Sequence, residues 1–186
     1  MRIRSYLALL VCACLLGAYV LEQVLAYRFT SVQTLAQEHS DSLLWQKDLQ
    51  RIENTASQFL ISSDLVIGSG NTYLIFGAKN MGEYLTNELA LMQSNSPFST
   101  LTSKIHESLT LVRSINGVLD IIADLPPTKL QRSLSQLLIQ YDPISLALSR
   151  NIQFLSQQTG MMVKIEAQFL QDEKKRMEQI SWVTRI

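Results

Sequence analysis

Residues 101–122 read LTSKIHESLTLVRSINGVLDII, and this stretch decides the fold class. Apolar side chains return in it every three or four residues, which is the spacing of one face of an α-helix, whereas a half-buried β-strand would alternate apolar and polar residues. The apolar positions are Leu101, Ile105, Leu109, Val112, Ile115, Leu119 and Ile122. The stretch therefore predicts an amphipathic helix with one face packed on a core.

Turn residues mark both ends of this helix. Ser96 followed by Pro97 has the order of a helix cap with proline at the first helical position. Residues 124–127, Asp-Leu-Pro-Pro, end the pattern, because proline has no backbone N–H and disfavours a helical residue before it. We therefore expect the helix between Pro97 and Asp124.

Helical spacing also precedes this stretch. We expect a long first helix to about Ser62, a break at residues 68–71, which read Gly-Ser-Gly-Asn, and a second helix from Tyr73 to Met92. The apolar positions are Phe29, Val32, Ala36, Leu43, Leu49, Ile52, Ala56 and Phe59 in the first helix, and Tyr73, Leu74, Phe76, Met81, Tyr84, Leu85 and Leu89 in the second.

Two further helical patterns follow. Residues 128–140 carry four leucines on one face, and Asp142 with Pro143 then repeats the order of a cap and a first-turn proline, so that a separate last helix is expected from there to about Ile180. Its apolar positions are Leu146, Leu148, Ile152, Leu155, Met162, Ile165, Phe169 and Met177. Short connections favour antiparallel neighbours. The expected domain is an all-α, elongated up-and-down bundle of the four-helix type, with long first and last helices.

The N-terminal segment has the length of a membrane span. Residues 5–21 read SYLALLVCACLLGAYVL, without a charge, and the segment reaches spanning length when extended to Tyr27, because about 20 residues cross a hydrocarbon layer of roughly 30 Å. Arg2 and Arg4 precede it, and the excess of basic residues on the cytoplasmic side of membrane proteins then orients the N-terminus inward. We expect an N-terminal transmembrane helix with the rest of the chain exported.

Two other interpretations of this segment stay open. A signal peptide cleaved after Val24-Leu25-Ala26 is one, although the apolar run exceeds the usual length of about 7 to 15 residues. A lipoprotein anchored through Cys14 is the other, and the apolar sequence after that cysteine argues against it. Under all three interpretations the bulk of the chain is exported.

The anchor divides the chain into four parts. Residues 1–4 are expected to be a cytoplasmic stub, 5–27 the transmembrane anchor, 28–180 the exported helical bundle, and 181–186 the start of a membrane-proximal segment. Trp182 favours an interfacial position for the last part. A second span, if one follows, lies beyond residue 186, and the chain is then a fragment or a shortened relative of something longer.

Composition argues against several functions. The 16 basic residues balance the 16 acidic ones, so the chain lacks the positive surface that a nucleic-acid-binding protein needs. Both cysteines, Cys12 and Cys14, lie in the apolar segment, which leaves the exported part without a disulfide or a thiolate metal ligand. We expect no nucleic-acid partner and no cofactor.

Ionisable residues give no catalytic or metal-binding pattern. His39 and His106 lack neighbours at metal-ligand spacing, and both are interpreted as solvent-facing helix residues. Residues 173–176, Glu-Lys-Lys-Arg, are interpreted as a solvated helix face with Asp172 paired to Arg176. The turn Gly68-Ser69-Gly70 matches no phosphate-binding glycine motif. We therefore expect no enzymatic activity and predict neither a catalytic nor a metal site.

One local stretch resembles a known class of domains. Residues 63–78, SDLVIGSGNTYLIFGA, are similar to a segment of the periplasmic sensory regions of bacterial transmembrane signalling receptors, such as histidine kinases, diguanylate cyclases and chemoreceptors. The chain layout of a basic stub, one span and an exported helical bundle resembles them too. The resemblance implies a periplasmic signal-input domain on the inner membrane, which forms a homodimer and binds a small molecule or a periplasmic binding protein.

The resemblance implies a signalling mechanism, and one alternative function stands beside it. A ligand that prefers one packing of the long helices would displace the last helix relative to the first. We predict the ligand or hinge region at the turn formed by Gly68, Ser69, Gly70 and Asn71, with Tyr73 beside it. The rival function is a single-span structural or adaptor protein, whose helical domain docks to an envelope complex.

Overall fold

Four long helices account for most of the chain. The computed structural model describes the backbone of residues 2–183 and the side chains of 6–126 and 129–180. The helices are α1 (Arg2–Ser69), α2 (Ile75–Ser94), α3 (Thr102–Asp124) and α4 (Pro127–Val183), with short 3-10 helices η1 (Thr72–Leu74) and η2 (Ser99–Leu101) before α2 and α3. Residues 2–183 contain no β-strand, so the prediction of an all-α chain with a long first helix is confirmed.

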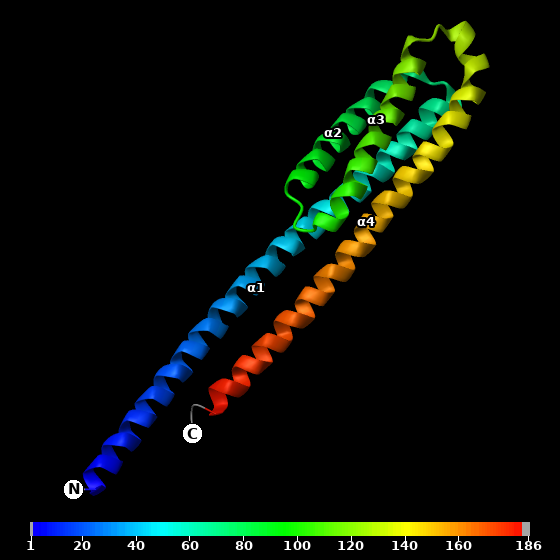
Figure 1. The fold of residues 1–186 in the computed structure, drawn as a ribbon. Coiled ribbons are helices and arrows are strands. Elements are labelled where there is room, and N and C mark those ends of the chain that lie inside the picture. The colour runs from blue at the N-terminus through cyan, green and yellow to red at the C-terminus, as the bar shows by residue number, and fades with distance from the viewer. Residues whose placement is uncertain (1, 184–186) are drawn as a thin grey trace. The chain divides into compact units, whose positions relative to one another are not determined.

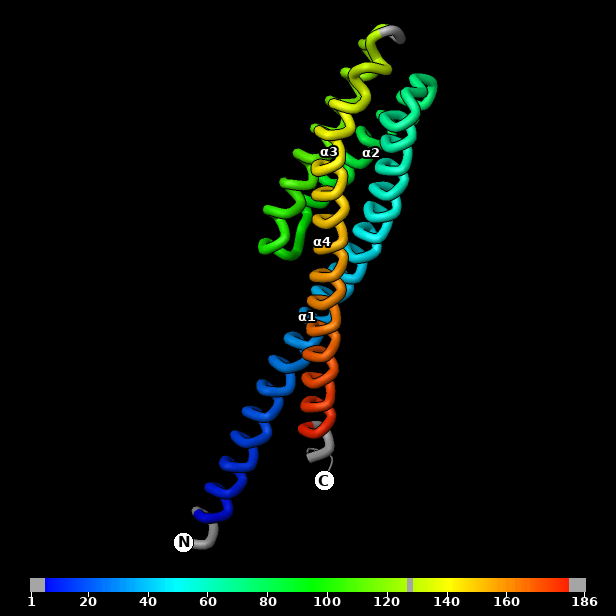
Figure 2. Tube along the Cα trace, turned by 90° about the vertical axis from the view of Figure 1, so that its right-hand side faces the viewer, coloured from blue at the N-terminus to red at the C-terminus, as the bar shows by residue number. Residues whose placement is uncertain are grey.

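The chain forms two compact units. We call residues Asp41–Val163 the core unit, and Met1–Ser40 together with Lys164–Ile186 the terminal unit. The core unit holds the second part of α1, all of α2 and α3, and the first part of α4, and these four segments lie side by side (Figures 1 and 2). It is therefore a helical bundle.

Buried apolar side chains from all four helices form the core of this bundle. Every apolar position predicted for residues 101–122 is buried, Leu101 in η2 and the others in α3. The other helices contribute Trp45, Leu49, Ile52, Ala56, Phe59, Val66 and Ile67 from α1, Ile75, Ala78, Leu85, Leu89 and Met92 from α2, and Leu130, Leu137, Tyr141, Leu148, Ile152 and Leu155 from α4. Each fully buried Leu, Ile or Phe stabilises the fold by about 1.5–3 kcal/mol, so this packing holds the unit together.

Gly70 ends α1 in a left-handed conformation with φ of +66°. Its N–H donates to the carbonyl of Val66, and the Oδ1 of Asn71 then accepts from the N–H of Tyr73 to start η1. An added Cβ at Gly70 would lie 3.2 Å from a methyl carbon of Leu134. The first helix thus ends at Ser69, not near Ser62 as predicted. Val66 and Ile67 are still buried in the core, and the helix continues until Gly70 allows the turn.

Close packing joins α2 to α3. A Cβ on Gly82 would overlap the side-chain amide of Asn116, so the glycine leaves room for that amide between the two helices. At the connection between them, the ring of Phe98 packs edge-on against Trp45 of α1, with centroids 5.6 Å apart. Ser96 accepts the N–H of Phe98 in this turn, and α3 itself begins only at Thr102, so the predicted helix start at Pro97 is wrong.

The C-terminal part of the chain is one helix where two were predicted. Pro127 begins α4, and Pro143 lies inside it. Proline leaves the carbonyl of Ile139 without its helical donor, a cost that usually ends or kinks a helix. Burial of Tyr141 before the proline and of Leu148 after it keeps both halves on the core. Packing therefore overrides the local signal from Asp142 and Pro143.

Some predicted core positions are exposed. Tyr73 and Phe76 point to solvent, and α2 is buried instead through Ile75, Ala78 and Gly82. In α1, Leu43 is exposed and Trp45 takes the core position. The buried face of α2 therefore includes the small residues Ala78 and Gly82. A prediction based on large apolar side chains underestimates the contribution of such small residues.

The apolar N-terminal segment belongs to α1 as well. Its most apolar window of 18 residues has a mean hydropathy of 2.1 and no buried residue. The segment is therefore long and apolar enough to cross a membrane. Signal sequences near the N-terminus meet the same two criteria. Residue 1 and residues 184–186 of the predicted stub and membrane-proximal segment lie outside the described residues, as do the side chains of 2–5 and 181–183.

Candidate functional site: the groove between α1 and α4

A groove of about 300 Å³ lies between α1 and α4 of the core unit. Its α1 wall consists of Glu53, Ala56, Ser57, Leu60, Ile61 and Asp64, and its α4 wall consists of Ser149, Ile152 and Gln153. Ala56 and Ile152 are buried and form the floor, whereas most of the polar residues are open to solvent. This volume is at the lower end of the range for small-molecule sites.

Glu53 marks one end of the groove. Its Oε2 accepts a hydrogen bond from the hydroxyl of Ser156 at 2.9 Å, which ties α1 to α4 across 103 positions of sequence. The carboxylate is half-buried. Because a carboxylate has about four acceptor positions, Glu53 keeps acceptor capacity for a ligand in the groove.

Asp64 marks the other end, beside Tyr141. The buried Tyr141 hydroxyl donates to the backbone carbonyl of Leu60 at 3.2 Å. Burial, and then the neighbouring carboxylate of Asp64, raise the pKa of the Tyr141 phenol far above its ordinary range. The phenol therefore stays protonated at physiological pH and acts as a hydrogen-bond donor that fixes α4 against α1.

Hydroxyl, amide and carboxylate side chains give the groove its polar groups. Ser57 and Ser149 are the hydroxyls in the wall, and no histidine, cysteine or lysine lines the groove to activate them. Among the described residues, no three His, Cys, Asp or Glu side chains come together in a metal-binding group. The groove offers hydrogen-bond acceptors and a small apolar floor.

The predicted ligand or hinge residues lie together at the connection between α1 and α2. Gly68 and Ser69 are the last residues of α1, Gly70 and Asn71 form the turn, and Tyr73 lies in η1 with its side chain 94% exposed. They do not line the groove between α1 and α4. Their hydrogen bonds are those of a helix-to-helix turn, including the hydroxyl of Ser69 that accepts from the N–H of Asn71 at 3.2 Å.

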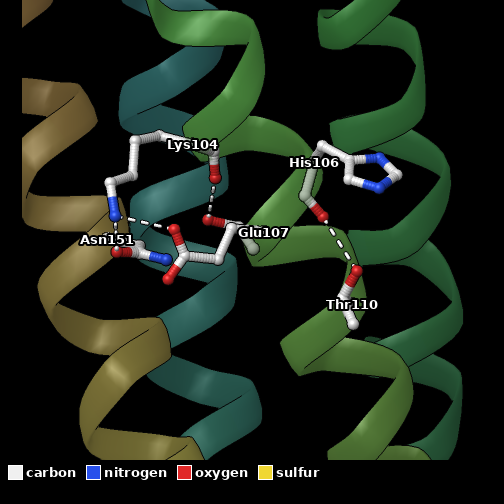
Figure 3. Close-up of polar contacts among 6 residues, drawn as sticks. Lys104, His106, Glu107, Thr110 and Asn151 are labelled. Atoms are coloured by element: carbon white, nitrogen blue, oxygen red, sulfur yellow. Dashed lines mark hydrogen bonds and ion pairs between the residues drawn. The ribbon is translucent and has the colours of Figure 1, made fainter.

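A second polar cluster joins α3 to α4 in the core unit (Figure 3). The ammonium of Lys104 lies 2.6 Å from Oε2 of Glu107 and 3.4 Å from Oδ1 of Asn151. Hydrogen bonding to Lys104, and then to Asn151, lowers the pKa of the Glu107 carboxyl. His106 is exposed and its ring points away from the cluster, as its interpretation as a solvent-facing residue requires.

In the terminal unit, α1 and α4 are joined by charged side chains. Glu173 is buried, and its Oε2 accepts from Arg28 of α1 at 3.1 Å while its Oε1 accepts from Arg176 at 2.8 Å. The prediction that residues 173–176 form a solvated face is therefore wrong for Glu173. Arg176 takes Glu173 as its partner, although Asp172 was predicted.

His39 also departs from its prediction. Its Nδ1 lies 3.7 Å from Oε2 of Glu166 on α4, and its side chain is mostly covered. It does not face solvent as expected. A second surface depression, of about 340 Å³, is lined by residues of α1 alone, from Tyr27 to Glu38. Because a single helix cannot enclose a ligand, the groove between α1 and α4 is the better candidate site.

Comparisons with protein-family models, curated protein sequences and solved structures give no match for this chain. Its function is therefore inferred from the geometry and chemistry of these residues. Glu53 and Asp64 were not singled out in the sequence, although a spacing of 11 residues is close to three helical turns and puts both on one face. Nothing local in the sequence relates them to Ser149 and Gln153, which lie about 90 positions further on.

Proposed function

We propose that this chain is the extracytoplasmic signal-input module of a bacterial membrane receptor. The observation that carries the proposal is the groove between α1 and α4, the two helices that also meet at Arg28 and Glu173. A ligand in the groove touches both helices. It therefore stabilises the relative position of α1 and α4 in which the groove fits it best.

The apolar segment of α1 is proposed to be the membrane anchor, with a cytoplasmic N-terminus and the bundle in the periplasm. Its length, its hydropathy and the preceding Arg2 and Arg4 support this. The core unit is proposed to be an up-and-down bundle, which the short connections between consecutive helices favour. Alkaline extraction of membranes tests the anchor: an uncleaved chain stays in the membrane, whereas a chain cleaved after Ala26 is released.

Signal transmission is proposed to be a displacement of α4 relative to α1. Pro143 leaves one backbone carbonyl of α4 unpaired near the groove, so α4 deforms there more easily than in its other turns. The displacement would then switch the ion pair of Arg28 and Glu173 between two states, one in which it is formed and one in which it is broken. A two-state contact of this kind converts ligand binding into a helix shift.

Distances between spin labels test this mechanism. The full chain in lipid nanodiscs, with Cys12 and Cys14 replaced by serine, carries labels at the exposed residues Gln33 of α1 and Gln171 of α4. Amines, amino acids, dicarboxylates and sugars are added singly. We expect at least one class to change the distribution of the distance from 33 to 171, while a control pair at Gln33 and Leu44 of α1 stays unchanged. No change with any class would contradict a sensory role.

Homodimerisation is proposed through the outer face of α4. Ile139, Leu146, Phe154 and Met161 are exposed, and their spacings of seven and eight residues put them on one stripe away from the core. An exposed apolar stripe of this kind is typical of a helix that packs against a partner. Light scattering of Phe154→Glu should give a monomer where the parent chain gives a dimer, and Leu91→Glu on exposed α2 surface should not.

An adaptor that docks to an envelope complex is the second candidate. Tyr73 of η1 and Phe76 of α2 favour it, since their side chains are 94% and 76% exposed and aromatic residues are frequent anchors of interfaces. A photo-crosslinking amino acid at position 73 tests it in cells. The adaptor would be favoured over the receptor if one envelope protein is captured and Phe76→Ser abolishes this capture. The distance from 33 to 171 should then not change.

A further inference from the structure

The charge of the groove between α1 and α4 is one-sided. Glu53 and Asp64 are its ionisable lining residues, and both are acidic. Within residues 6–180, neither carboxylate forms an ion pair. Arg51, nearby on α1, is engaged by Glu88 at 2.6 Å and by Asp48 at 3.5 Å. The groove is therefore complementary to a cation, since unlike charges attract most strongly where water is partly excluded.

The spacing of the two carboxylates restricts the shape of that cation. Eleven residues of α-helix correspond to an axial separation of about 16 Å and a rotation of about 20° beyond three turns. Glu53 and Asp64 therefore lie on the same face, at opposite ends of the groove. One compact charge cannot contact both, whereas an extended molecule with positive groups along its length can.

A metal ion does not fit these residues. Ca²⁺ and Mg²⁺ need several oxygen ligands at about 2.0–2.6 Å from one centre. The two carboxylates are far too distant from each other to share an ion, and the described residues contain no metal-binding group. The cation is therefore organic.

The middle of the groove suits an aliphatic chain with hydrogen-bond donors. Leu60, Ile61 and Ile152 supply apolar surface, and the side chains of Ser57 and Gln153 supply acceptors between the two charged ends. We propose that the groove binds a linear aliphatic polyamine, with one ammonium group at Glu53, another at Asp64 and the methylene chain between them. The inference rests on the proposed sensory function and gives the ligand class of that site.

Titration calorimetry of the full chain in nanodiscs tests this with spermidine and spermine as probes. Both bind, and their affinity falls as salt is raised, because screening weakens partly exposed ion pairs. Butylamine, which has one charge, and MgCl₂, which has a compact divalent charge, serve as comparison ligands. Equal affinity for butylamine or Mg²⁺ would overturn the proposal.

Two conservative variants locate the site. Glu53→Gln and Asp64→Asn remove the charges but keep hydrogen-bond acceptors for Ser156 and Tyr141. Each substitution lowers polyamine affinity about tenfold, which is the loss expected for one charge-assisted hydrogen bond. Glu83→Gln, which removes an exposed carboxylate of α2 outside the groove, leaves affinity unchanged. Undiminished binding to both groove variants would overturn the location.

The spin-label distance separates this inference from the proposed function. If no polyamine binds but another compound class changes the distance from 33 to 171, the ligand class is wrong and the sensory role stands. If polyamines bind in the groove without changing that distance, the ligand class stands and the sensory role is wrong. Loss of both responses would remove both proposals.

Discussion

Gly70 is the residue on which the connection between α1 and α2 depends. Its φ of +66° lies in the left-handed region, which costs a residue with a Cβ roughly 1–2 kcal/mol. An added methyl group would also press on Leu134 of α4. Gly70→Ala should therefore lower the free energy of unfolding in urea by at least about 1 kcal/mol.

Gly68 is the matched control for this substitution. It lies within α1, and no atom approaches within 4 Å of the position of an added Cβ. Gly68→Ala should leave stability unchanged or raise it by up to about 1 kcal/mol, because alanine favours the helix. Equal destabilisation by the two substitutions would show that the left-handed turn has no special cost.

Tyr141 makes stability depend on alkaline pH. The phenol ionises near its ordinary pKa of 10.0 in the unfolded chain, but only at higher pH in the folded one. Its contribution to stability is therefore fully present below pH 10 and is lost as the pH rises above that value. Urea midpoints at pH 9 and pH 11 should differ less for Tyr141→Phe than for the parent chain.

The same variant has a separate effect at neutral pH. Tyr141→Phe removes the hydrogen bond to the carbonyl of Leu60, which costs about 0.5–1.5 kcal/mol. A pH dependence that is identical in the two proteins would mean that Tyr141 does not hold its proton in the folded state.

At the scale of the element, α4 is weakest at Pro143. Pro143→Ala restores a donor for the carbonyl of Ile139 and removes the clash of the proline ring, and Pro143 is exposed. We expect the substitution to raise the free energy of unfolding by roughly 1–3 kcal/mol. Faster amide hydrogen exchange around residue 143 after the substitution would contradict this account.

The coupling free energy of the ion pair Arg28–Glu173, which joins α1 to α4, is expected to exceed that of Arg176–Glu173, which lies within α4. Glu173 is 7% exposed, whereas Arg28 is 41% and Arg176 is 65% exposed. Double-mutant cycles with Glu173→Gln should give a larger coupling for Arg28→Gln than for Arg176→Gln, with the latter no more than about 0.5 kcal/mol. Opening free energies from hydrogen exchange at residues 166–173 provide the measurement, and equal couplings would contradict it.

Elements differ in how well their sequences predict them. The face of α3 follows directly from spacing, because most of its large apolar residues are on the buried side, with Ile121 as an exposed exception. In α2 the interface is made partly by Ala78 and Gly82, whose small size matters only once Asn116 of α3 is known to lie opposite. The proline signal at Pro143 is local, and it is overridden by the burial of Tyr141, a contact with α1 that no local pattern contains.

The candidate site was harder to predict than the helices. The turn from Gly68 to Asn71 is visible in sequence because glycines mark it, yet the groove lies elsewhere on the bundle. Its two walls come from segments about 90 residues apart, and their proximity depends on the packing of four helices. The ligand or hinge role of the turn stays a prediction.

At the scale of the whole molecule, the two units are expected to differ in stability. The core unit buries apolar residues from four helices, whereas Glu173 is the one buried residue among 6–40 and 164–180. Backbone amides of the core unit should therefore exchange more slowly than those of residues 28–40 and 164–180. Uniform protection across the chain, measured by mass spectrometry in nanodiscs, would contradict this division.

The hydrogen bond between Glu53 and Ser156 closes a loop of more than 100 residues, whereas Gly82 and Asn116 meet within one helical hairpin. Local contacts form sooner in folding because they require less chain to be ordered first. We therefore expect α2 and α3 to pair early, and the walls of the groove to meet only after α4 has been synthesised. A ligand that binds there would act on a contact that forms late, and it would therefore stabilise newly made protein.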